Sequence, residues 1–419
     1  MRRLIFSLTL VSIFLTFNAY SQRTNKVDQL LFSGQYKSAI PLLKQLVKKD
    51  STDSKWYFRL GKVYQNLNQN KSAIENYQKA LDLNPNSVAT LYNYSSCLYS
   101  SGNYPAAKHE LLKLQKIDSM HYQGNLLLAK TNTTLNDYNE GLAIYNKLVE
   151  RDSLNPYLHK QIGNLKNRTQ DYIGSLAAYL ISYDLNPKDL SVVLHIIQKF
   201  YEMSAYDQAL TYANNGLNSF PNNHMILKKK AQTLIGLEWY ENALPILLDL
   251  KERKKLKLPD FKQLGICYMQ TRKYKLAIKS FNTCGETFEK DPMINFYKGV
   301  CYSRLHDDIK GIKYLENAIA YVTLPIKASM HLHLAKAYNS NREFEKAVDQ
   351  YQKHFKLDGR NIEVLYEIAT TYEEYGDNKE EALKYYAQYM RETENKGDER
   401  YEYAKSRILH IKEKIHFEK

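Results

Sequence analysis

Tyrosine recurs at a constant interval of 34 residues through the middle of this chain. The copies follow one another without a break, at Tyr104, Tyr138, Tyr172, Tyr206, Tyr240 and Tyr274. A fixed period of this size indicates one supersecondary unit copied in tandem, in which each copy buries its apolar face only by stacking on its neighbours. The spacing therefore predicts a repeat solenoid rather than a set of independent globular domains.

Small residues recur with the same period. When Ser54 is taken as position 1, position 8 is small in almost every unit, at Gly61, Ser95, Ala129, Gly163, Ala231, Gly265, Gly299, Ala335 and Ala369. Two antiparallel helices approach closely only where no large side chain intervenes, so position 8 predicts the crossing point of a helical hairpin. Ile197 is the exception, and we expect looser or displaced packing there.

The pattern resembles the tetratricopeptide repeat (TPR). The first complete unit carries Leu60, Gly61, Tyr64, Ala73 and Pro85 at positions 7, 8, 11, 20 and 32. The resemblance implies an all-α fold, a right-handed superhelix of antiparallel helical hairpins. It implies ten units over residues 54–396, starting at residues 54, 88, 122, 156, 190, 224, 258, 292, 328 and 362.

The segments on either side of the ten units are expected to extend and cap the solenoid. Tyr36 lies two periods before Tyr104, so residues 22–53 are interpreted as a degenerate N-terminal repeat. Residues 397–419 carry an apolar stripe at helical spacing. The stripe consists of Ala404, Ile408, Ile411 and Ile415. It predicts a C-terminal capping helix that covers the exposed face of the last hairpin.

The first 21 residues have a different character. Arg2 and Arg3 precede an apolar run from Leu4 to Phe17, and the small residues Ala19 and Ser21 follow. This is the pattern of a cleavable signal peptide over residues 1–21. The run is shorter than the about 20 residues of a spanning helix. We therefore expect an exported protein, periplasmic or associated with the outer membrane.

The net charge bears on the class of partner. Loss of Arg2 and Arg3 from the 59 basic residues leaves 57 against 45 acidic ones, so the charge falls from +14 to +12. Outside the cytoplasm such a charge suits acidic polysaccharides, lipid headgroups or acidic protein faces rather than nucleic acid. No transmembrane segment is expected in the mature chain, and peripheral association with the envelope stays open.

No catalytic or cofactor motif is present in the sequence. HExxH, CxxC, the nucleophile elbow and glycine-rich phosphate loops are all missing. His331 and His333 stand two residues apart on an expected helix, which directs them to different faces rather than to one metal ion. We therefore expect a protein that is not an enzyme and that needs no cofactor and no metal.

The cysteines occupy interior positions of the repeat. Cys97, Cys267 and Cys301 stand at position 10 and Cys284 at position 27, where the resemblance leads us to expect small residues. We interpret them as core side chains. A Cys267–Cys284 or Cys284–Cys301 disulfide is the alternative, since an exported protein meets oxidising conditions.

Three loops between units share an Asp-Ser-x pattern. Ser51, Ser119 and Ser153 each follow an aspartate there. The pattern resembles the O-glycosylation sequon of exported proteins in one group of Gram-negative bacteria. A serine at such a place is also a natural N-cap for the helix that follows, and both interpretations stay open.

The resemblance also places a ligand groove. It implies that the first helix of each hairpin lines the concave face and that positions 2, 5, 6, 9 and 12 point at a ligand. These positions carry basic, amide and aromatic side chains: Arg59, Lys62, Tyr92, Asn93, Lys130, Lys160, Gln161, Asn164, His195, Gln198, Lys228, Lys229, Gln232, Lys262, Tyr297 and Lys336. Such a lining can bind the backbone and the carboxylates of an extended peptide.

Part of this set is similar to the carboxylate clamp of chaperone-binding members of the family. Lys160 and Asn164 match its first pair. The match then fails, because His195 stands for an asparagine, Met225 for a lysine, and Lys229 only partly replaces an arginine. Lys160, Asn164, His195 and Lys229 therefore remain groove candidates without a defined ligand.

The sequence as a whole favours a non-enzymatic exported scaffold or adaptor. We expect it to bind a protein or an extended peptide in its concave groove, in envelope assembly or secretion. Binding of acidic polysaccharide or cell-wall material through the basic, aromatic-rich surface is the alternative. That alternative is weakened if the periodic tyrosines are buried in hairpin packing.

Overall fold

The computed structural model describes residues 24–285, 289–322, 326–375, 378–393 and 398–417, and the regular structure of these residues is helical. Residues 24–32 form the N-terminal helix. The helices that follow are α2 (Tyr36–Lys49), α3 (Ser54–Asn66), α4 (Asn70–Leu83), α5 (Val88–Ser100), α6 (Tyr104–Ile117), α7 (Tyr122–Thr134), α8 (Tyr138–Arg151), α9 (Pro156–Arg168), α10 (Tyr172–Leu185), α11 (Leu190–Glu202), α12 (Tyr206–Ser219), α13 (His224–Gly236), α14 (Tyr240–Glu252), α15 (Asp260–Gln270), α16 (Tyr274–Thr283), α17 (Pro292–Arg304), α18 (Asp308–Tyr321), α19 (Lys327–Ser340), α20 (Phe344–Leu357), α21 (Glu363–Tyr375), α22 (Lys379–Glu392) and α23 (Glu399–Phe417). The signal peptide expected at residues 1–21 lies outside the described residues.

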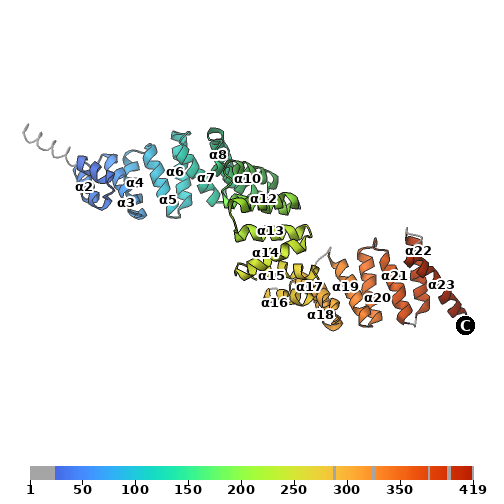
Figure 1. Cartoon of the computed structure of the whole chain (residues 1–419). Helices are drawn as coiled ribbons and strands as arrows, with labels where there is room; N and C mark the ends of the chain where they lie inside the picture. The colour runs from blue at the N-terminus through green and yellow to red at the C-terminus, as the bar shows by residue number, and fades with distance from the viewer. Residues whose placement is uncertain (1–23, 286–288, 323–325, 376–377, 394–397, 418–419) are drawn as a thin grey trace, which may run out of the picture. The chain divides into compact units, whose positions relative to one another are not determined.

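The helices pair into successive antiparallel hairpins (Figure 1). We call the two helices of each hairpin its first helix and its second helix. The first helix, such as α3 or α9, packs most extensively against the second helix of the same hairpin. That second helix also packs on the first helix of the next unit. The chain divides into two compact parts, residues 1–199 and residues 200–419, called here the N-terminal part and the C-terminal part. Each part is therefore a stack of helical hairpins, which is the all-α solenoid that the sequence predicted.

Polar side chains define where the first helices begin. Asp53, Ser87, Asn155 and Asn223 stand just before such helices, and a side-chain oxygen of each accepts a backbone N–H of the first turn. At α7 the Nδ1 atom of His121 accepts the amide of Gly124. These caps satisfy amides that have no partner inside the helix.

The caps settle one of the two interpretations of the loop serines. The N-cap residues of α3, α7 and α9 are Asp53, His121 and Asn155. The expectation that Ser51, Ser119 or Ser153 would fill this role was wrong. The side chains of all these serines are exposed. Glycosylation of these serines stays a prediction.

The turns inside the hairpins from α3–α4 to α19–α20 share one conformation. The residue at position 15 has a positive φ in successive units, at Asn68, Gly102, Asn136, Gln170, Ser204, Glu238, Arg272, His306 and Arg342. The next residue then donates its amide to the carbonyl of position 11, as from Asn103 to Leu98 over 2.9 Å. This left-handed ending satisfies carbonyls of the first helix and directs the chain into the second.

Glycine at position 8 makes room for a large side chain on the second helix. A Cβ atom on Gly163 would lie 2.8 Å from the ring of Tyr179, and one on Gly61 would lie 2.6 Å from Tyr77. The small residues therefore mark a close helix crossing, as their spacing predicted. Ile197 is completely buried, so its larger side chain is accommodated rather than displaced into solvent.

The periodic tyrosines pack at the start of the second helices. The Tyr206 ring covers Gly236 at the end of the next first helix, because a Cβ there would lie 2.8 Å from it. The Tyr104 ring meets Tyr99 with a centroid distance of 5.2 Å. Tyr172 keeps 49% of its surface exposed while the Lys199 ammonium lies 4.6 Å above its ring. These tyrosines therefore take part in hairpin packing, which leaves less of each ring for a sugar.

The cysteines are core side chains. Cys97, Cys267, Cys284 and Cys301 are all buried free thiols, so neither of the disulfides left open is present in the structure. Burial raises the pKa of Cys267 and of Cys301 to about 12. Such thiols stay protonated at neutral pH and are poor nucleophiles.

The last helix closes the C-terminal part. The buried Ala404 and Ile411 of α23 pack on the last hairpin, and Ile408 and Ile415 contact the same cluster. Arg407 also makes an ion pair with Glu373. No helix in the described ranges combines the length and the apolar character that crossing a bilayer requires.

Candidate functional site

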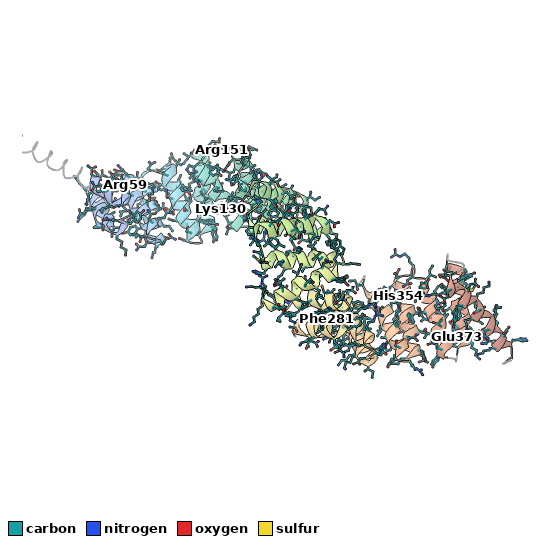
Figure 2. All side chains as sticks on the ribbon, in the orientation of Figure 1. Arg59, Lys130, Arg151, Phe281, His354 and Glu373 are labelled. Carbon is teal, nitrogen blue, oxygen red and sulfur yellow. The ribbon has the colours of Figure 1, made fainter. Side chains whose placement is uncertain are left out.

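First-helix side chains occupy the inner side of each stack. In the N-terminal part α3 contacts α5 and α5 contacts α7, and in the C-terminal part the series α13, α15, α17 and α19 is joined in the same way. The described second helices make no contacts of that extent with one another. Successive first helices therefore lie closer together. Side chains at positions 2, 5, 6, 9 and 12, called here the first-helix row, share this surface, and Figure 2 labels two of them, Arg59 and Lys130.

Lysine at position 5 of the first-helix row forms an ion pair with the following unit. The Nζ atom of Lys160 lies 2.9 Å from Asp189, that of Lys228 lies 2.5 Å from Asp260, and that of Lys262 lies 3.0 Å from Asp291. Each aspartate stands at or just before the start of the next first helix. These pairs are partly buried, with 22 to 30% of each side chain exposed.

Two of these aspartates, Asp189 and Asp291, cap the helices that they precede. Asp189 accepts the amides of Ser191 and Val192 over 3.0 and 3.3 Å, while Asp291 accepts those of Met293 and Ile294 over 2.8 and 2.9 Å. Burial raises the pKa of both carboxyls, but the lysine and the helix amides outweigh it and hold that pKa below its usual value. The carboxylates are therefore charged at neutral pH and offset the positive charge of the lysines paired with them.

These ion pairs change the interpretation of four candidates. Arg59 is compensated like the three lysines, because its guanidinium lies 2.6 Å from Asp28. Sequence reasoning took Arg59, Lys160, Lys228 and Lys262 as open ligand contacts and missed their partners. A signal was available, because an aspartate follows Lys160 and Lys262 at the same distance of 29 residues.

Tyr179 brings two residues of the clamp-like set, Asn164 and His195, together in the N-terminal part. Its hydroxyl donates to Oδ1 of Asn164 over 2.8 Å, and its ring stacks on His195 with a centroid distance of 4.8 Å and an angle of 21°. His195 also shares a hydrogen bond of 2.6 Å with the carbonyl of Ser191. With Lys160 bound to Asp189, this cluster is a packed polar network. Lys229, the fourth residue, belongs to the C-terminal part.

The remaining candidates keep more of their polar surface available. Lys62 is exposed, and Gln198, Lys229 and Gln232 are half-buried. The Lys130 ammonium lies 5.3 Å above the ring of Tyr157. The other contacts are local: the Tyr92 ring meets His121 at 5.5 Å, and Asn93 donates to the carbonyl of Ala89 over 2.7 Å. Burial lowers the pKa of Lys229, an effect that Glu202 partly opposes.

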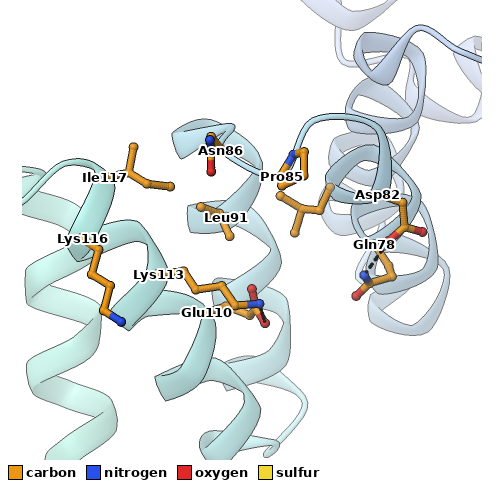
Figure 3. Close-up of a pocket in the computed structure, with 10 residues that line it drawn as sticks. Gln78, Asp82, Pro85, Asn86, Leu91, Glu110, Lys113, Lys116 and Ile117 are labelled. Atoms are coloured by element: carbon orange, nitrogen blue, oxygen red, sulfur yellow. Dashed lines mark hydrogen bonds and ion pairs between the residues drawn. The ribbon is translucent and has the colours of Figure 1, made fainter.

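A cleft of about 510 Å³ opens on the other side of the N-terminal part, between the second helices α4 and α6 (Figure 3). Three of its four charged side chains, Asp82, Glu110 and Lys113, make local contacts. Lys113 lies 2.9 Å from Glu110, and Gln78 donates to Asp82 over 3.0 Å, as the dashed lines show. Among these four described charged residues only Lys116 has no such contact, so this cleft is a weaker candidate than the first-helix row.

Metal binding was not expected from the sequence. In the ranges that the structure describes, no group of three His, Cys, Asp or Glu side chains comes together that could hold a metal ion. His331 and His333 lie in different surroundings. His331 makes a 2.6 Å hydrogen bond from Nδ1 to Gln350, whereas the ring of His333 packs against Phe296 with a centroid distance of 5.2 Å.

Stacked helical hairpins with a 34-residue period define an α-solenoid. Residues 54–87 and residues 363–392 each match a family model described as tetratricopeptide repeat. The chain therefore carries tetratricopeptide repeats at these two places. The two matched segments lie at opposite ends of the series of units inferred from the sequence.

The chain is similar at low identity to curated proteins and to solved structures. Anaphase-promoting complex subunit 3 of Schizosaccharomyces pombe is 20% identical over 312 residues, 74% of this chain and 41% of that protein. The Hsp70-Hsp90 organizing protein of Triticum aestivum is 22% identical over 243 residues, 49% of this chain and 42% of that protein. The chain thus spans less than half the length of either relative. The crystal structure of the APC/C hetero-tetramer Cut9-Hcn1 aligns with a TM-score of 0.41 and 15% identity, over 92% of this chain and 95% of that one.

Proposed function

We propose that this protein is a non-catalytic scaffold that binds an extended polypeptide segment along the first-helix row. The observation that carries the proposal is the contrast between the interior and the row. Interior positions repeat from unit to unit, as Gly61 and Gly163 do at position 8, whereas position 9 of the row changes, for example from Lys62 to Asn164 and Gln232. A lining of this kind can distinguish one partner from another.

The relatives agree with this proposal. One is by its name a subunit of a larger complex and the other an organizing protein. A basic row with amide groups suits the carbonyls and carboxylates of an extended chain. The aspartate-bound lysines support the row indirectly, since they link one unit to the next and hold the first helices in place.

Photo-crosslinking in intact cells tests the proposal. A photoreactive amino acid replaces Lys62, Asn93 or Gln232 on first helices, and the matched controls replace the exposed Lys71, Lys147 or Lys279 on second helices. We expect discrete polypeptide adducts from the first-helix positions only. Equal labelling from both faces, or no polypeptide adduct at all, would count against a polypeptide-binding row. Adducts with glycan in place of polypeptide would favour the polysaccharide alternative.

We also propose that the protein acts outside the cytoplasm, in envelope assembly or secretion. The basic, apolar and small residues of segment 1–21 motivate this proposal. Sequencing the N-terminus of the protein purified from cells checks it, and Gln22 is the expected first residue. An intact Met1 together with a cytoplasmic location would contradict it.

A further inference from the structure

A pocket of about 370 Å³ opens in the C-terminal part between the first helices α17 and α19. Its walls come from both helices and from the hairpin between them. The lining residues are Val300, Ser303, Arg304, His306, Leu315, His333, Lys336, Ala337 and Ser340. The pocket therefore joins an apolar floor to a polar rim, and no carboxylate lies among the residues that line it.

The two cations of the pocket have no acidic partner. Arg304 and Lys336 are exposed, and neither makes an ion pair with any residue in the described ranges. Lys228 and Lys262 of the same part differ, because each is neutralised by an aspartate. The charge of Arg304 and Lys336 is therefore not offset by a carboxylate of the described residues, and their hydrogen-bond donors are available for a ligand.

The charges of both cations affect the pKa of His333. Burial, and after it the charges of Lys336 and Arg304, lower the pKa of His333 to about 4. The imidazole is therefore neutral at pH 7 and carries one N–H. The described residues offer this ring no hydrogen-bond partner, and it meets the Phe296 ring at an interplanar angle of 77°. The pocket thus presents a third donor beside the two cationic groups.

We propose that this pocket binds a carboxylate group of an acidic polypeptide segment, through Arg304, Lys336 and the His333 imidazole. The inference rests on the proposed function, because the pocket opens on the first-helix row. Half-buried Val300 provides apolar surface for the methylene groups of a glutamate or aspartate side chain, and the buried Leu315 and Ala337 lie beneath it. A guanidinium beside an ammonium favours a planar carboxylate by charge-assisted hydrogen bonds.

A fluorescein-labelled hexaglutamate peptide is the probe, and its fluorescence anisotropy is measured with the purified full-length chain. We expect the double substitution Arg304→Gln and Lys336→Gln to weaken binding by about tenfold or more, because two charge-assisted contacts are lost. Both side chains are exposed and unpaired, so the thermal midpoint should not change. The substitution His333→Phe keeps the ring packing and removes the N–H, and it should weaken binding by about threefold.

The matched control is Lys275→Gln with Lys279→Gln on α16, where both lysines are exposed and the charge changes equally. We expect this control to weaken binding less than about twofold. Equal losses of hexaglutamate affinity in the two double variants would overturn the pocket proposal, because the change in net charge alone would then explain both losses. Displacement of the peptide by inorganic phosphate as readily as by acetate would refute the preference for carboxylate.

The failure of this inference can be distinguished from the failure of the proposed function. If the wild-type chain does not bind hexaglutamate, the pocket proposal is wrong. The photo-crosslinking at Lys62, Asn93 and Gln232 then still decides whether the first-helix row binds a polypeptide. Adducts there without hexaglutamate binding would mean that the partner is recognised by groups other than acidic side chains.

Discussion

The Nζ atom of Lys160 lies 2.9 Å from the carboxylate of Asp189, which at the same time caps the first turn of α11. One carboxylate thus fixes the start of a helix and links it to the unit before. The arrangement is repeated in the C-terminal part by Lys262 and Asp291. Lysines that seemed to be open ligand contacts therefore hold successive first helices in register.

The two roles of Asp189 can be separated by substitution. Lys160→Gln removes only the ion pair and should lower the free energy of unfolding by up to about 1 kcal/mol. Asp189→Ala also removes the cap and should cost about 1 to 3 kcal/mol. Urea denaturation followed by circular dichroism measures both. Equal costs for the two variants would show that the cap adds nothing to the pair.

The Gly163 and Tyr179 pair supports a prediction about the helix crossing. A Cβ on Gly163 would lie 2.8 Å from the Tyr179 ring, so Gly163→Ala should cost about 1 to 3 kcal/mol through overpacking. Combining Gly163→Ala with Tyr179→Leu should relieve this overpacking. Ala231 and Leu247 occupy the corresponding positions of another unit, and both are fully buried.

A double-mutant cycle checks the relief. The loss in the double variant should be smaller than the sum of the two single losses, because the residues are in contact. Tyr179→Leu alone also removes the hydrogen bond to Asn164, which the cycle subtracts. Additive losses would mean that the ring moves aside without cost.

The interior was predictable from the sequence because packing repeats with the unit. Gly163 and Gly265 are glycine for the same local reason, the ring of Tyr179 or Phe281 opposite. The first-helix row was less predictable. Whether Lys160 is free depends on the distance to Asp189, which lies in another unit and is set by stacking. The sequence also does not show whether a basic residue has an acidic partner. Only the coordinates show that Arg304 and Lys336 are exposed and have none among the described residues.

Gly102 supports a prediction about the hairpin turns. Its φ is +81°, and a Cβ there would meet no atom within 4 Å. Gly102→Ala should therefore cost about 1 kcal/mol through backbone strain alone. Gly102→Asn is the control, because Asn68 and Asn136 occupy the same position in other units, and it should cost about half as much. Thermal unfolding measures both, and equal losses would indicate a steric cause.

The last prediction concerns the acid stability of the C-terminal part. Burial and the two neighbouring cations lower the pKa of His333 from 6.5 to about 4, so the unfolded chain takes up this proton first as the pH falls. The resulting stability is fully present above about pH 6.5 and is lost as the pH falls towards 4, by at most about 3 kcal/mol. His333→Phe, measured by urea denaturation between pH 7.5 and 4, should lose less stability over that range than the wild type. The difference between the two chains isolates His333 from the other titrating groups, and identical pH profiles would show that its ring is not held neutral in the folded chain.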